Sequence, residues 1–139
     1  MPYSWVSPII DRTATSYYNY TDPNRVDNNT RYLEEYVEAY IGYTINLEAY
    51  TTSTKTTLPT NEQINLLERN INEVRDALTY DPSGWITLDE SWVGGDTFVY
   101  TDANALEQNL STLKTNFENI YDGFRRCGTF NAGSKMTTL

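Results

Sequence analysis

Three carboxylates at matching positions are the first residues in this sequence that could do chemistry. Asp27, Glu68 and Glu107 each end a run of asparagine, any residue, aliphatic residue and acid. Pairs of carboxylates act as general acid and base in glycoside hydrolysis, but nothing in the sequence marks a sugar-binding cleft beside them. Acids in the first turns of helices also interact favourably with the helix dipole. The chain has no histidine, the commonest general base, so we predict no catalytic residue and no enzymatic activity.

Acidic residues also flank a glycine pair, Gly94-Gly95, where a metal or phosphate loop would be sought. A calcium loop alternates its acids around a glycine, and Asp89, Glu90 and Asp96 lack that spacing. A phosphate loop would place a lysine after the glycines, whereas Asp96 follows them here. We therefore predict no metal site and no cofactor.

An asparagine stands two residues after each of the three repeated acids. Asn29, Asn70 and Asn109 lie on or beside the apolar rows of their expected helices. A buried amide left without partners costs roughly 1–3 kcal/mol, so each should be hydrogen-bonded. The three amides either meet in one polar layer that sets helix register, or each ties down the backbone of an entering loop, or they bind a ligand. Because an amide offers a backbone both a donor and an acceptor, we favour a structural role.

Two tryptophans, Trp85 and Trp92, stand in an irregular aromatic stretch before the last expected helix. They could stack against a sugar, with a cell-surface glycan as the ligand, or they could plug the end of a helical bundle. We favour the plug, because a small bundle must be closed where its apolar rows open.

The first nineteen residues carry apolar side chains without a helical period. An exposed patch made by five of them, each large, would be unusual on a free monomer. The arm therefore lies on its own bundle or on a neighbouring subunit. We expect the following residues to form an interface between subunits: Trp5, Ile9, Ile10, Tyr17 and Tyr18.

The phrase that carries the acids and asparagines occurs three times and marks three amphipathic helices. In each copy an aliphatic residue follows the second asparagine by four positions. The first helix is expected to begin at Asp22, an N-cap followed by Pro23, and to continue to Tyr50. That length rests on an apolar row with a period of 3.5 over roughly 28 residues, weakened at Gly42.

The other two helices have clearer starts. Thr60 and Gln63 form a capping box at the start of the second helix, and the third helix is expected to start at Asp102. Apolar residues then recur in steps of three and four. The predicted core of these two helices is Leu67, Ile71, Val74, Leu110, Leu113 and Phe117.

Together these elements predict one mainly α domain in a chain of 139 residues. An extended arm occupies residues 1–19 and a three-helix bundle domain residues 20–127. An aromatic loop or short hairpin precedes the last helix, and an extended tail occupies residues 128–139.

The charge and cysteine content restrict the partners. The net charge is -9, from 10 basic and 19 acidic residues, which disfavours nucleic acid and anionic membranes and favours a basic or neutral partner. No apolar run is long enough for a membrane span. The start of the chain lacks the features of a secretion signal. Cys127 is the single cysteine, so no internal disulfide can form and assembly in the cytoplasm is expected.

Four short motifs are spread along the chain: Asp11-Arg12-Thr13, Asn24-Arg25-Val26-Asp27, Leu58-Pro59-Thr60 and Phe124-Arg125-Arg126-Cys127-Gly128. With these motifs the chain resembles small virion proteins of tailed bacteriophages and prophages of Gram-positive bacteria. The usual form has Glu in place of Asp27 and an aliphatic residue in place of Pro23. The resemblance extends over most of the chain and brings no enzymatic residues.

The resemblance implies a structural component of a bacteriophage virion, in the tail tip, baseplate or fibre-attachment region. Such a protein would work by binding other virion subunits and copies of itself, and would be located in the phage tail. Two alternatives stay open: a carbohydrate- or receptor-binding module of the tail, and a connector at the head–tail neck or collar.

Overall fold

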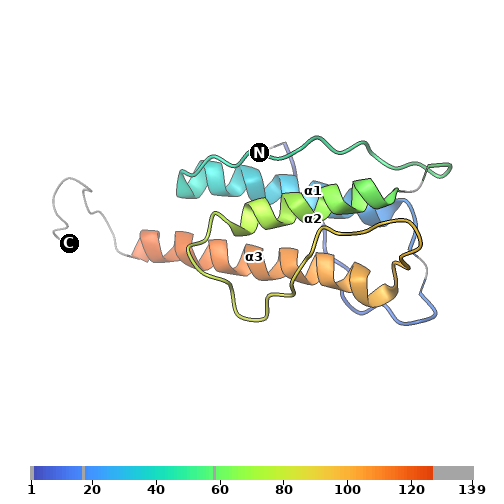
Figure 1. The fold of residues 1–139 in the computed structure, drawn as a ribbon. Coiled ribbons are helices and arrows are strands. Elements are labelled where there is room, and N and C mark those ends of the chain that lie inside the picture. The colour runs from blue at the N-terminus through green and yellow to red at the C-terminus, as the bar shows by residue number, and fades with distance from the viewer. Residues whose placement is uncertain (1, 17, 58, 127–139) are drawn as a thin grey trace.

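Three parallel helices form the body of the protein. The structure is a computed structural model and describes residues 2–16, 18–57 and 59–126. Helix α1 spans Thr21–Tyr36 and continues into a π-helical turn, η1, at Val37–Ile41; α2 spans Asn61–Arg75 and α3 spans Tyr100–Arg126. The colour ramp of Figure 1 shows that all three helices run in the same direction. The predicted mainly α three-helix bundle is confirmed, while the predicted tail at 128–139 lies outside the described residues.

The core consists of matching positions of the three sequence repeats. In each helix the aliphatic residue two places after the first asparagine is buried, as is the one nine places after it. The six core residues predicted for the second and third helices are all buried. The two matching rows are Val26, Leu67 and Leu106, and Leu33, Val74 and Leu113. The sequence repeat is therefore a structural repeat, in which each helix contributes the same face to one shared core.

The first helix is shorter than predicted. It ends at Gly42, whose φ of 88° is left-handed and whose N–H donates to the carbonyl of Val37 at 2.8 Å. A glycine adopts this conformation without steric cost and commonly ends helices. The expected continuation to Tyr50 is wrong, because residues 43–53 are extended. The apolar row beyond the glycine does not belong to a helix, and Tyr43 is 52% exposed.

The three helices start with the same hydrogen bond. The side chain two residues before the first asparagine of each repeat accepts the backbone N–H of the residue three places earlier. The Asp22 carboxylate accepts the backbone N–H of Asn19, and the Asp102 carboxylate accepts that of Val99, at 2.8 and 2.9 Å. The predicted capping box in α2 provides the third copy, with Gln63 in the same role. The two aspartates thus lie inside the first turn, and their helices begin at Thr21 and Tyr100 rather than at the predicted aspartates.

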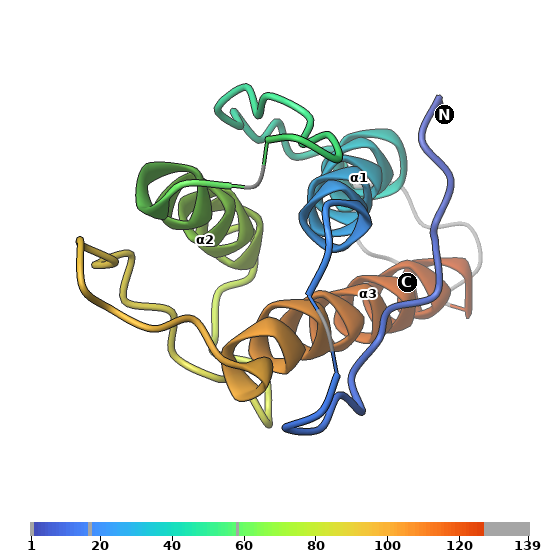
Figure 2. The same cartoon turned by 90° about the vertical axis from the view of Figure 1, so that its right-hand side faces the viewer.

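Three extended segments return the chain to the starting end of the bundle between one helix and the next. We call residues 5–13, 43–53 and 85–93 the return segments; none of them forms a β-strand. Figure 2, which looks along the bundle, shows that each lies outside the groove between two helices: 5–13 between α3 and α1, 43–53 between α1 and α2, and 85–93 between α2 and α3. The stretch before the last helix is therefore a loop rather than a hairpin. The arm at the start of the chain is one of three equivalent segments.

Candidate functional site

The second asparagine of each repeat holds a return segment by its backbone. The amide oxygen of Asn29 accepts the N–H of Val6 at 3.0 Å, and its Nδ2 donates to the carbonyl of the same residue at 2.8 Å. Asn70 and Asn109 make the same pair of bonds to Glu48 and Ile86, at 2.7–2.9 Å. All three amides are buried and all hydrogen-bond protein groups. They tie down entering backbone, as one of our two structural alternatives states, and no shared polar layer forms.

The first asparagine of each repeat makes the same pair of hydrogen bonds to one backbone residue at the other end of a return segment. We call such a pair of bonds a clamp. Asn24 holds Ser53 at 2.8 and 2.9 Å, and Asn65 holds Trp92 at the same two distances. Asn104 holds Arg12, at 3.1 and 3.2 Å. Each return segment is thus fixed at both ends, once by the helix that follows it and once by a neighbouring helix. Because the clamps use only backbone groups, the side chains of the segments are free to vary.

The repeated acids hold the middle of the segments in two of the three grooves. Glu107 accepts the N–H of Ile9 at 3.1 Å, and Glu68 accepts the N–H of Glu90 at 2.9 Å. The third acid, Asp27, has a shorter side chain and pairs instead with Arg31 on its own helix at 3.3 Å. We predicted helix-dipole partners and no catalysis from these acids. The structure adds a role in segment binding that position on the helix did not indicate.

The groove between α3 and α1 contains a buried cluster of four charges. The carboxylate of Glu107 is fully buried and forms ion pairs with Arg12 and Arg25, with N···O distances of 2.5 and 2.6 Å. Asp22 pairs with the same two guanidinium groups, at 2.8 Å from Arg12 and 2.5 Å from Arg25. Two positive and two negative groups balance there, and the shared geometry satisfies their hydrogen-bonding capacity, as burial of charge requires. The cluster joins the arm to both the first and the last helix.

Burial and pairing act in opposite directions on the pKa of Asp22. Burial alone would raise it, but the backbone N–H of Asn19 and the guanidinium groups of Arg25 and Arg12 outweigh burial and hold the pKa below its ordinary value. At Glu68 burial dominates: the pKa is raised, despite the hydrogen bonds from Trp92 and from the backbone of Glu90. Equivalent grooves of the repeat therefore have different electrostatics.

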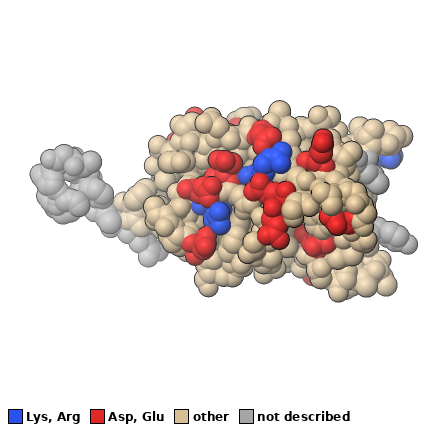
Figure 3. Space-filling model, viewed as in Figure 1, with Lys and Arg blue, Asp and Glu red and all other residues tan. Residues whose placement is uncertain are grey.

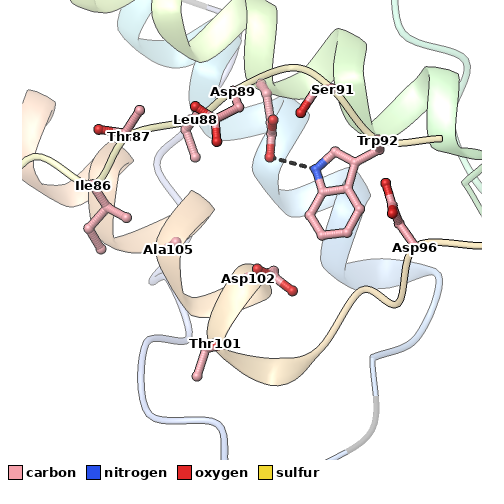
Figure 4. A pocket seen from close by; sticks show the side chains of 11 residues that line it. Ile86, Thr87, Leu88, Asp89, Ser91, Trp92, Asp96, Thr101, Asp102 and Ala105 are labelled. Carbon is pink, nitrogen blue, oxygen red and sulfur yellow. Dashed lines mark hydrogen bonds between the residues drawn. The ribbon is translucent and has the colours of Figure 1, made fainter.

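A hollow lies in the groove between α2 and α3, beside Glu68. It encloses about 470 Å³ between the return segment 85–93 and the start of α3. Figure 4 shows Trp92 on one side with its indole nitrogen bonded to a carboxylate, which is that of Glu68 at 2.9 Å, and Asp102 and Ala105 on the opposite helix. No lysine or arginine of the described chain forms an ion pair with Glu68 or Asp102.

The predicted stacking residues do not form one platform. Trp92 is the residue that Asn65 clamps, and its ring packs against Phe98 at 5.3 Å. Trp85 is the first residue of the same segment, and the guanidinium of Arg75 lies 5.6 Å from the centre of its ring. Both indoles are partly buried and touch the core cluster or its neighbours.

The residues predicted to form an interface divide into two groups. Trp5 packs on the chain's own Tyr32 at 5.6 Å, and Tyr18 packs on Phe98 at 5.1 Å. Ile9 and Ile10, by contrast, are 39% and 49% exposed on the outside of the arm. Tyr17 lies outside the described residues.

Sequence reasoning missed Arg12, Arg25 and Asp22 as members of a buried cluster and gave no role to the first asparagines. A signal for the asparagines was present, because they recur as regularly as the second ones. The charge cluster had no such signal, since it occurs in only one of the three copies.

No group of metal-binding side chains that could hold an ion exists in the described part of the chain. None of its described helices is long and apolar enough to cross a membrane. Comparisons with protein families, curated proteins and solved structures gave no match to this chain.

Proposed function

We propose that this protein is a structural component of a bacteriophage virion, in the tail tip, baseplate or fibre-attachment region, and that it works by binding neighbouring subunits. The observation that carries the proposal is an apolar strip held on a fixed backbone. Ile9 and Ile10 are exposed between two clamped residues, Val6 and Arg12.

A fixed strip of this kind is suited to binding. The arm backbone is bonded to α1 through Asn29 and to α3 through Asn104 and Glu107. Ordering a loop at the moment of association costs free energy, and an interface that is ordered beforehand avoids that cost. The two isoleucines therefore offer apolar area to a partner with little further loss of entropy.

The sequence resemblance supports the same role, and two of its motifs contribute residues to the scaffold. Arg12 of the Asp-Arg-Thr motif and Arg25 of the Asn-Arg-Val motif both belong to the buried charge cluster. Residues of this kind set the fold and leave the exposed strip as the part that determines the partner.

The test places two negative charges on the strip and measures folding and assembly separately. Ile9→Asp combined with Ile10→Asp should leave the far-UV circular dichroism and the unfolding midpoint close to wild type. Particles assembled in cells that supply only this variant should lack the protein, as judged by immunoblot of purified particles. Antibody labelling of wild-type particles should place the protein in the tail.

Val93→Asp is the matched control, because Val93 is 61% exposed and lies on another return segment. It should be incorporated like wild type. Normal incorporation of the double variant would overturn the proposal that this strip is the assembly surface. Absence of the wild-type protein from all particles would overturn the virion role.

A further inference from the structure

We propose that the hollow beside Glu68 binds an arginine side chain supplied by a partner polypeptide. The proposal starts from a comparison of two grooves within one molecule. The acids Glu68 and Glu107 are equivalent in the repeat, and so are the segment residues Trp92 and Arg12, each clamped by the first asparagine of the same helix as its acid. Both segment side chains donate an N–H to their acid.

The neighbouring helix contributes two more equivalent positions. Asp22 and Arg25 on α1 border the groove of Glu107, and Asp102 and Ala105 on α3 border that of Glu68. Three of the four members of the charge cluster thus have polar or donor counterparts in the second groove. The fourth, Arg25, is replaced by alanine, which removes a guanidinium group and leaves open volume in its place.

The hydrogen bonds show which acceptors are left over. Each oxygen of Glu107 accepts two bonds: Oε1 from Ile9 and Arg25, and Oε2 from Arg12 and Arg25. Each oxygen of Glu68 accepts one, from the backbone of Glu90 or from Trp92. A carboxylate oxygen has two lone pairs, so the two unused acceptor positions on Glu68 are those that Arg25 occupies on Glu107.

The second carboxylate repeats this pattern. Asp22 uses Oδ2 for the helix start and Oδ1 for two guanidinium groups. Asp102 uses Oδ2 in the same way, toward Val99, and its Oδ1 accepts no hydrogen bond from the described residues. Two carboxylates therefore line the hollow with unused acceptor oxygens that correspond to those bonded to Arg25 in the other groove.

The room and the charge fit an arginine better than other occupants. The hollow is far larger than the roughly 30 Å³ that one water takes up, and Trp92 supplies an aromatic wall. A planar guanidinium donates in a fork that matches a carboxylate, which the point charge of lysine does not. The excess of acidic groups on the face seen in Figure 3 and the net charge of -9 favour a basic partner.

The inference extends the proposed assembly role by naming the chemistry of a partner, but its test uses the isolated protein and does not depend on virions. We would titrate the protein with N-acetyl-arginine amide and follow the indole N–H of Trp92 by nuclear magnetic resonance. A saturable shift is expected, with a dissociation constant on the order of millimolar, because the probe is small. N-acetyl-lysine amide should bind more weakly, and the neutral citrulline analogue should not shift the resonance.

Two variants decide where the probe binds. Glu68→Gln should weaken binding about tenfold or more, since it removes a charged acceptor. Ala105→Arg should place the chain's own guanidinium in the hollow, abolish probe binding and raise the unfolding midpoint. The control Gln108→Arg adds the same charge on the exposed side of α3 and should change neither quantity.

Several results would overturn the proposal. No saturable shift at Trp92, equal shifts from the citrulline analogue, or undiminished binding to Glu68→Gln would each show that the hollow does not take a guanidinium. An unfolding midpoint of Ala105→Arg below that of Gln108→Arg would show the same, because the geometry would then not accept the group. These outcomes leave the apolar strip and the virion role untouched.

Discussion

Replacing Asn109 by alanine tests the clamps directly. Asn109 is fully buried, and both ends of its amide bond the backbone of Ile86, at 2.9 and 2.7 Å. Each such bond contributes about 0.5–1.5 kcal/mol net, so two give about 1–3 kcal/mol. The upper half of this range applies, because truncation leaves a donor and an acceptor facing a space that was filled. We expect a loss of about 2–3 kcal/mol in the free energy of unfolding, which is a large share of a stability of about 5–15 kcal/mol.

The assay is urea unfolding followed by circular dichroism, with a thermal scan alongside. A loss of this size should lower the unfolding midpoint by roughly 6–12 °C in a domain of this length. Hydrogen exchange should show reduced protection of the Ile86 amide, because the return segment opens locally. The control is Gln108→Ala, which truncates the exposed neighbour and should change stability by less than about 0.5 kcal/mol. If Asn109→Ala were as stable as Gln108→Ala, the clamp would contribute nothing and the account of the return segments would fail.

Three further outcomes are expected. Leu113→Ala should cost about 2–5 kcal/mol in unfolding free energy, the usual range for a buried leucine; a thermal shift indistinguishable from wild type would contradict the shared core. Glu107→Gln should cost about 3–5 kcal/mol, because it leaves two buried arginines short of a counter-charge. Glu68→Gln in the equivalent groove should cost less, about 1–3 kcal/mol, because it removes the acceptor of one N–H donor, from Glu90 or Trp92, but leaves no buried cation unpaired; equal losses in urea unfolding would contradict the difference between the grooves. The pKa of Asp22 is lowered in the folded protein, so the stability that its charge contributes is complete above its ordinary pKa of 3.8 and is lost as the pH falls through the lower folded value. The stability difference between wild type and Asp22→Asn should therefore shrink as the pH falls below 3.8. A difference that grew would contradict the ion pairing.

The presence of the helices and the identity of the core residues could be predicted, because both follow from the spacing of nearby residues in the sequence. The capping box of Thr60 and Gln63 and the aliphatic steps around Leu113 needed no tertiary information. The length of the first helix could not be predicted in this way. The left-handed Gly42 ends the helix, although the tyrosines and Leu47 continue the apolar row beyond it. The backbone of Glu48 is instead held by Asn70, a contact 22 residues along the chain that the apolar row does not indicate.

The burial of single site residues could be predicted from the sequence, but the way in which these residues come together could not. The burial and hydrogen bonding of Asn29, Asn70 and Asn109 follow from their common phase. The partners of these amides are backbone groups, which carry no sequence information, so the return segments could not be recognised as equivalent from their side chains. The hollow depends on a short side chain at Ala105, where the equivalent position of the first helix has Arg25. This difference has meaning only when the grooves are compared.

The placement of the arm has a consequence for the order in which the fold can be completed. Ile9 is bonded to Glu107 and Arg12 to Asn104, so the arm waits for residues that are synthesised 92–98 positions later. A nascent chain emerges from the ribosome at roughly 5–20 residues per second, and the arm stays unbound until α3 has left the exit tunnel. Contacts at such long sequence separation slow folding. Because the arm occupies the groove between α3 and α1, closure also leaves no groove for a fourth repeat, unlike an open solenoid that must be capped.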